Sequence, residues 1–136
     1  MKDKIDLTIK PTIACNMKCK HCFNGDTFAP TNTLDVGTAL VLVEKACKEY
    51  KIVKIIFHGG EPSLVGIHFY KEFFKTIDYF KERYNTSFNI LFTTNGLLLT
   101  DNFIDLLNKN NVLINISFDG PYNNLLRQKT KKIQET

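Results

Sequence analysis

The sequence has no long apolar run, and its few cysteines are not spread along the chain. No stretch of the 136 residues approaches the roughly 20 apolar residues of a membrane helix, so no membrane span is predicted. The N-terminus, Met1-Lys-Asp-Lys-Ile5, lacks the apolar core of a signal peptide. Four unevenly placed cysteines, three of them crowded together, do not make the framework of a disulfide-rich secreted domain. These absences predict a cytoplasmic protein.

The sequence also lacks the features that accompany nucleic-acid binding. Its net charge is +4, but much of the excess lies in one basic run, Arg127-Gln-Lys-Thr-Lys-Lys132. No aromatic platform or reading helix accompanies this run, so nucleic acid is not the expected partner. The composition, 43% hydrophobic and 24% charged, is ordinary for a globular protein, and the length suits one domain over residues 1–136.

Three cysteines occur at C-x3-C-x2-C spacing in Cys15-Asn-Met-Lys-Cys19-Lys-His-Cys22. Thiolates this close can bind one metal centre, and a [4Fe-4S] cluster held by only three cysteines keeps one iron open to a small molecule. Zinc is an alternative, because these cysteines and His21 form a mixed ligand set, although no second C-x2-C or His pair follows. A third interpretation is that these cysteines are inert thiols that bind no metal. Cys47 lies in an apolar helical pattern and is predicted to be core.

Turn residues divide the rest of the chain into alternating strand-like and helix-like segments. Strands are predicted over 5–13, 52–57, 88–94 and 112–118, where apolar and β-branched residues alternate or run together. Helices are predicted from a cap at Thr33 to about Tyr50, over 63–84, and from Thr100 and Asp101 onward. This alternation predicts right-handed βαβ units, a parallel sheet and an α/β fold.

Four unusual groups each follow a predicted strand: the cysteine segment, Gly59-Gly60-Glu61-Pro62, Asn95-Gly96 and Asp119-Gly120-Pro121. The carboxyl ends of parallel strands meet at one edge of a sheet, where α/β proteins bind ligands, so these groups are predicted to face one site. Each group alone is also explained by the need of loops for turn residues. Their joint occurrence with the cysteine motif favours a ligand site.

The cysteine motif, together with His58-Gly-Gly-Glu-Pro62 and Ser117-Phe-Asp-Gly-Pro121, resembles the motifs of radical S-adenosylmethionine (SAM) enzymes. In that family SAM chelates the fourth iron of a [4Fe-4S] cluster, and its reductive cleavage yields a 5′-deoxyadenosyl radical. The resemblance covers nearly the whole chain and implies Cys15, Cys19 and Cys22 as cluster ligands and SAM as a second cofactor. Among these enzymes the motifs most resemble those of peptide- and protein-modifying maturases, such as sulfatase maturases.

The resemblance also implies contacts to SAM. The segment Gly59–Pro62 would meet the amine end of the methionine moiety, because bare glycine backbone can approach a ligand closely. Glu61, an acceptor, suits an ammonium group, although a carboxylate that only favours a helix N-terminus explains it equally well. Asn95 would line the pocket, or is an ordinary turn residue. The other implied contacts are His21 and Phe23 at the adenine, Ser117 and Asp119 at the ribose or substrate, and Arg127 at the cofactor carboxylate, where the spacing from Asp119 is shorter than in relatives.

The implied fold is a parallel (βα)n partial barrel of TIM type, with about four of the usual six strands. No run after Pro121 suits a fifth buried strand, so residues 1–136 are expected to be the N-terminal portion of the core domain, completed by a longer chain or a partner chain. Implied partners are a peptide or protein substrate and an external one-electron reductant of flavodoxin or ferredoxin type. A non-catalytic cluster- or SAM-binding module and a zinc-stabilised binding domain stay open as alternatives.

Overall fold

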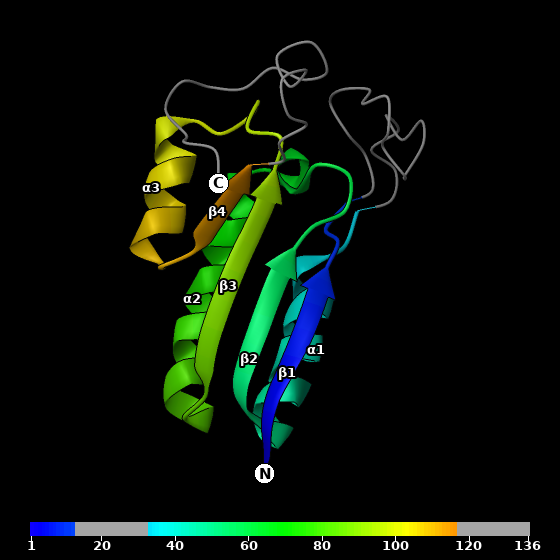
Figure 1. Cartoon of the computed structure of the whole chain (residues 1–136), viewed down its shortest axis with the longest axis vertical. Helices are drawn as coiled ribbons and strands as arrows, with labels where there is room; N and C mark the ends of the chain where they lie inside the picture. The colour runs from blue at the N-terminus through cyan, green and yellow to red at the C-terminus, as the bar shows by residue number, and fades with distance from the viewer. Residues whose placement is uncertain (13–32, 117–136) are drawn as a thin grey trace.

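A computed structural model describes residues 1–12 and 33–116 and shows one four-stranded parallel sheet (Figure 1). The strands lie in chain order, β1-β2-β3-β4, and all point the same way, so their carboxyl ends form one edge. Helices α1 and α2 lie behind the sheet in this view. The α/β fold and the parallel sheet predicted from the sequence are confirmed. The bounds are β1 Lys2–Ile9, α1 Val36–Glu49, β2 Tyr50–Phe57, the 3-10 turn η1 Pro62–Val65, α2 Ile67–Tyr84, β3 Ser87–Thr94, α3 Asp101–Lys109 and β4 Leu113–Ile116.

An aromatic cluster holds α2 and α3 against the sheet. Phe57 of β2 meets Tyr70 and Phe73 of α2 edge-on, with ring centroids 5.1 and 5.0 Å apart. Phe103 of α3 packs 5.4 Å from Tyr70 and 5.7 Å from Phe92 of β3, so α3 lies on the same face as α2. All five rings are buried. Burial of rings this large contributes about 2–3 kcal/mol each and makes the sheet a rigid support for the loops at its edge.

Two predicted boundaries near the N-terminus are wrong. The first strand was expected over 5–13, but β1 ends at Ile9, because Pro11 has no N–H to continue the ladder. The helix cap was expected at Thr33, which instead forms an isolated antiparallel bridge with Thr12. Asp35 is the N-cap of α1, and its side chain accepts a hydrogen bond from the Thr38 N–H at 3.3 Å.

The second predicted helix, over 63–84, is broken in two. The 3-10 turn η1 precedes α2, and Gly66 separates them with φ of 89° and ψ of 161°. This backbone conformation is essentially restricted to glycine, so the break is encoded at that residue. The helical part of the prediction is confirmed within α2, whose buried face consists of Tyr70, Phe73, Phe74, Ile77 and Phe80.

No described helix covers the other face of the sheet, which carries mixed side chains. Lys54 and Ile56 of β2 are only half-buried there, next to Asn89 and Leu91 of β3. Leu113 on the edge strand β4 is 64% exposed. In the part of the chain that the structure describes, no helix is long and apolar enough to cross a membrane.

Candidate functional site

The chain segments that follow β1, β2 and β3 meet at the carboxyl edge of the sheet. The ladder between β2 and β3 ends at the pair Phe57 and Phe92, and β1 ends beside β2 at Ile9. Beyond these pairs, side-chain and turn hydrogen bonds join the segments to one another. The structure therefore brings together two of the groups that the sequence placed at one edge, the segment 59–62 and Asn95.

The described residues on either side of the cysteine segment 13–32 pair with each other. Thr12 and Thr33 pair in an antiparallel bridge, and the Leu34 N–H donates to the Pro11 carbonyl at 2.6 Å. Thr12 and Thr33, the described residues on either side of the segment 13–32, thus lie side by side. Eight predicted site residues lie outside the described residues, either in this segment or in 117–136: Cys15, Cys19, His21, Cys22, Phe23, Ser117, Asp119 and Arg127.

Gly59 and Gly60 lie directly against Thr12, the residue that precedes the cysteine segment 13–32. The Gly60 N–H donates to the Thr12 carbonyl at 3.1 Å. Gly59 has φ of 116°, and a Cβ atom there would lie 2.7 Å from the same carbonyl oxygen. The left-handed backbone belongs to Gly59 and not to Gly60, which has no positive φ. Gly59 is thus required by the close approach of two backbones three residues before Cys15.

The Glu61 carboxylate is almost completely buried, with 1% of the residue exposed. Its Oε2 accepts hydrogen bonds from the Ser63 N–H at 3.2 Å and from the Ser63 hydroxyl. From β3, the Thr94 hydroxyl donates to the same oxygen at 2.5 Å, and the Asn95 N–H donates to Oε1 at 2.7 Å. Four donors satisfy a charge that would otherwise be costly to bury. Glu61 also caps the turn η1.

Tyr70 of α2 also contacts the turn η1, which Glu61 caps. Its hydroxyl donates to the Pro62 carbonyl at 2.6 Å, and the residue has no exposed surface. Burial, followed by the negative charge of Glu61, holds the pKa of this phenol well above its usual value near 10. The hydroxyl therefore stays protonated as a donor at neutral pH.

Asn95 begins a tight turn after β3. Its side-chain Oδ1 accepts from the Leu97 N–H at 3.0 Å, and the Gly96 N–H donates to the Thr94 hydroxyl at 3.0 Å. Gly96 has φ of 84°, as a turn of this kind requires. Asn95 is therefore a turn residue in this structure, buried to 5% exposure at the edge where the ligand site was predicted.

The sequence reading did not single out Thr12, Ser63, Thr94 or Tyr70 as site residues. Thr94 is the last residue of β3 and stands next to Asn95 in Thr-Thr-Asn-Gly, so its position at the end of a strand could have drawn attention. Nothing in the sequence around Tyr70 distinguishes it from the other aromatic residues of α2. Among the described residues, no group of three or more His, Cys, Asp and Glu side chains could hold a metal ion.

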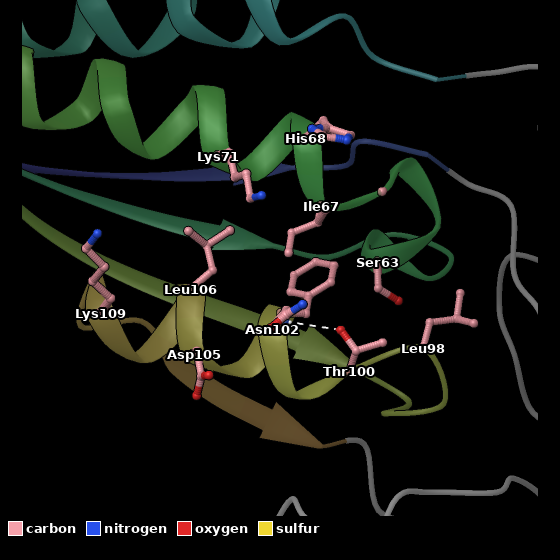
Figure 2. A pocket seen from close by; sticks show the side chains of 12 residues that line it. Ser63, Ile67, His68, Lys71, Leu98, Thr100, Asn102, Asp105, Leu106 and Lys109 are labelled. Carbon is pink, nitrogen blue, oxygen red and sulfur yellow. Dashed lines mark hydrogen bonds between the residues drawn. The ribbon is translucent and has the colours of Figure 1, made fainter.

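A separate hollow of about 700 Å³ lies between α2 and α3, on the helical side of the molecule (Figure 2). His68 and Lys71 project from α2, while Asp105 and Lys109 belong to α3. No site residue predicted from the sequence lines this hollow. Its lining is Ser63, Gly66, Ile67, His68, Lys71, Leu98, Thr100, Asn102, Phe103, Asp105, Leu106 and Lys109.

A parallel α/β sheet whose carboxyl edge carries a cysteine segment, a double-glycine turn and an Asn-Gly turn is the arrangement expected of a radical SAM core. The sequence model of the Radical SAM superfamily matches residues 9–135. The chain belongs to this superfamily, and the family of enzymes predicted from the motifs is confirmed.

Similar proteins include two kinds of sulfatase-maturating enzyme. The cysteine-type anaerobic sulfatase-maturating enzyme of Clostridium novyi (strain NT) is 32% identical over 126 residues, covering 85% of this chain and 33% of that protein. The serine-type anaerobic enzyme of Klebsiella aerogenes is 27% identical over 115 residues, covering 79% and 27%. The chain thus spans about a third of the length of these relatives.

Solved structures show the same fold. Histidine-tagged anSMEcpe with bound AdoMet superposes with a TM-score of 0.81 at 27% identity, covering 93% of this chain and 35% of that one. Native anSMEcpe with bound AdoMet and the Cp18Cys peptide gives 0.79. Streptococcus suis SuiB, at 21% identity and a TM-score of 0.60, shares the fold. The four strands of this chain therefore correspond to part of a radical SAM (βα)n barrel.

Proposed function

We propose that residues 1–136 form the N-terminal portion of the core domain of a radical SAM enzyme that modifies a peptide or protein. The observation that carries this proposal is the meeting of three segments at one edge of the sheet. The base of the cysteine segment at Thr12, the Gly59-Gly60 turn and the Asn95 turn are linked by hydrogen bonds there. Parallel α/β sheets bind their ligands at this edge.

Cys15, Cys19 and Cys22 would hold a [4Fe-4S] cluster. Three thiolates within eight residues suit this cluster, and three cysteine ligands keep one iron open to a further ligand. When bound, the cluster and SAM would supply the radical chemistry, the one-electron reductive cleavage of SAM to methionine and a 5′-deoxyadenosyl radical. The electron would come from an external reductant of flavodoxin or ferredoxin type. Such thiolates need a reducing compartment, so we place the protein in the cytoplasm.

The residues of this chain would bind and orient SAM. Bare backbone at Gly59 and Gly60 would lie near the amine end, in a turn held by Glu61 and Pro62. Asn95 would line the pocket from the next strand. We assign the remaining contacts to His21 and Phe23 at the adenine, Ser117 and Asp119 at the ribose or substrate, and Arg127 at the carboxylate of SAM.

A peptide substrate is supported by the relatives. Two of the similar solved structures contain anSMEcpe with a bound peptide, Cp18Cys or Kp18Cys, at 27% identity to this chain. The curated relatives act in sulfatase maturation by their names. A substrate side chain held at the carboxyl edge would be shielded from water there, as radical chemistry requires.

The test is anaerobic reconstitution with iron and sulfide, followed by iron analysis, visible absorbance and an assay of SAM cleavage. We expect a coloured protein that cleaves SAM, and loss of iron when Cys15, Cys19 or Cys22 is changed to alanine. Cys47→Ala is the matched control, because burial raises the pKa of this thiol and makes it a poor ligand. Equal iron binding by Cys19→Ala and the parent would refute the cluster. Colour without cleavage would indicate a non-catalytic module, and a colourless protein that retains zinc would indicate a zinc domain.

A further inference from the structure

We infer that Glu61 is a positioning residue, whose carboxylate holds Asn95 and its turn in place for the cofactor and does not itself contact the cofactor. The inference rests on the proposed function for the identity of the ligand. It concerns how two edge segments are joined, which the hydrogen bonds of the described residues show directly.

Hydrogen-bond donors of the protein already occupy both oxygens of the Glu61 carboxylate. Both oxygens accept hydrogen bonds, Oε1 from the Asn95 N–H at 2.7 Å and Oε2 from Thr94 and Ser63. An ionised carboxylate only accepts, and each of these partners has a proton to donate. A ligand ammonium group would have to reach a residue that is 1% exposed and compete with these donors.

The hydrogen bonds of Glu61 lie just beyond the end of the β2–β3 ladder. The β2–β3 ladder ends at the pair Phe57 and Phe92, so no ladder hydrogen bond joins the two strands beyond it. Glu61 comes four residues after Phe57, and the Asn95 N–H three residues after Phe92 donates to it. The carboxylate thus continues the connection between β2 and β3 past the end of the sheet, as a substitute for backbone pairing.

The hydrogen bonds of Glu61 also reach the rest of the turn after β3, through Thr94. The Thr94 hydroxyl both donates to Glu61 and accepts from the Gly96 N–H, so the carboxylate also fixes Gly96 through Thr94. Asn95 is then held at its N–H by Glu61 and at its Oδ1 by the Leu97 N–H. Buried charge-assisted hydrogen bonds are strong and directional, so Glu61 fixes the Asn95 backbone, and the Leu97 N–H then fixes its side chain.

The first experiment needs no cofactor. Hydrogen exchange is measured by NMR on the full 136-residue chain for the parent, Glu61→Ala, Glu61→Gln and the control Glu82→Ala, an exposed glutamate of α2. In Glu61→Ala we expect the Asn95 and Gly96 amides to exchange at least about tenfold faster, because a hydrogen bond of this kind is lost. Amides of β2 should be unchanged and report that the sheet is intact. Glu61→Gln keeps one oxygen that can accept from the Asn95 N–H, but its NH2 group cannot accept from the Ser63 N–H, so exchange at Asn95 and Gly96 should fall between that of the parent and that of Glu61→Ala.

If Glu61→Ala does not fold, Thr94→Val provides the same measurement. Valine keeps the shape of threonine and removes the hydroxyl that joins the Gly96 N–H to the carboxylate. Gly96 loses its own acceptor in this variant whatever Glu61 does, so the Asn95 amide is the diagnostic one. We expect faster exchange at Asn95 with an intact β2, because the Glu61 carboxylate has lost its Thr94 donor. Unchanged exchange at Asn95 in the folded variants would overturn the inference.

The second experiment separates positioning from direct contact. The dissociation constant of SAM is measured for the reconstituted parent, Glu61→Gln, Glu61→Ala, Asn95→Ala and the double variant Glu61→Ala/Asn95→Ala. Positioning predicts about tenfold weaker binding in Glu61→Ala, a smaller loss in Glu61→Gln, which keeps one of the two acceptor oxygens, and almost no further loss when Glu61→Ala is added to Asn95→Ala.

Direct contact with an ammonium group predicts a different pattern. Glu61→Gln would then weaken SAM binding about as much as Glu61→Ala, and the loss would be the same with or without the Asn95 side chain. That pattern would overturn the inference while leaving the proposed function intact. If the parent does not bind SAM, the proposed function fails, and the exchange experiment still decides whether Glu61 positions Asn95.

Discussion

Two glycines with positive φ and different surroundings allow a direct measurement of the contact between the Gly59 turn and Thr12. Gly59 and Gly66 have φ of 116° and 89°. Alanine at either position is strained by about 1–3 kcal/mol. A Cβ atom at Gly66 meets nothing within 4 Å, whereas at Gly59 it would lie 2.7 Å from the Thr12 carbonyl oxygen. That oxygen is fixed by its bond from Gly60, so the collision adds about 1–3 kcal/mol of overpacking.

We therefore expect Gly59→Ala to lower the free energy of unfolding by about 1–3 kcal/mol more than Gly66→Ala does. The entropy that alanine removes from the unfolded chain is common to both variants and cancels in the comparison. Urea denaturation followed by circular dichroism measures both values, and an unchanged m-value shows that the same transition is compared. Gly59→Ala should also take up less iron on reconstitution, because Thr12 lies three residues before Cys15. Equal destabilisation and equal iron content in the two variants would refute the reasoning.

Four further predictions concern single residues. Tyr70→Phe leaves the buried Pro62 carbonyl without its donor and should lower the free energy of unfolding by about 1–3 kcal/mol, whereas Tyr79→Phe at an exposed site should have little effect. The pKa of Tyr70 is raised in the folded state, so the parent should lose stability as the pH rises above about 10, and this loss should be smaller in Tyr70→Phe titrated alongside it. Gly60→Val should weaken SAM binding in equilibrium dialysis while the cluster persists; unchanged affinity would mean that the segment is only a turn. Leu113→Lys should reduce self-association in light scattering, because leucine on an open edge strand favours pairing between chains, and an equally associated variant would contradict this.

The alternation of strands and helices and the parallel pairing of the strands were predictable from the sequence. Apolar periodicity marks α2, and short apolar runs bounded by turn residues mark β2 and β3. The ends of helices and strands were less predictable where a residue can form either of two local structures. Thr33 is a good cap by its chemistry, but its pairing with Thr12 left that role to Asp35.

The cysteine spacing and the groups after each strand identified the superfamily, because they are local patterns of the chemistry itself. The roles of residues within those groups depended on partners far away in the chain. Glu61 and the Asn95 N–H are 34 residues apart, and only the packing of β2 beside β3 makes them neighbours. Likewise the sequence could not tell which of two adjacent glycines needs a left-handed backbone, because Thr12 approaches Gly59 through the register of β1 on β2. Sequence periodicity thus predicted where the strands end, and with them the edge at which we propose the site, since strand ends follow from local patterns. The tertiary structure decided which groups hold it together, since a buried polar group bonds to whatever donors the fold places beside it.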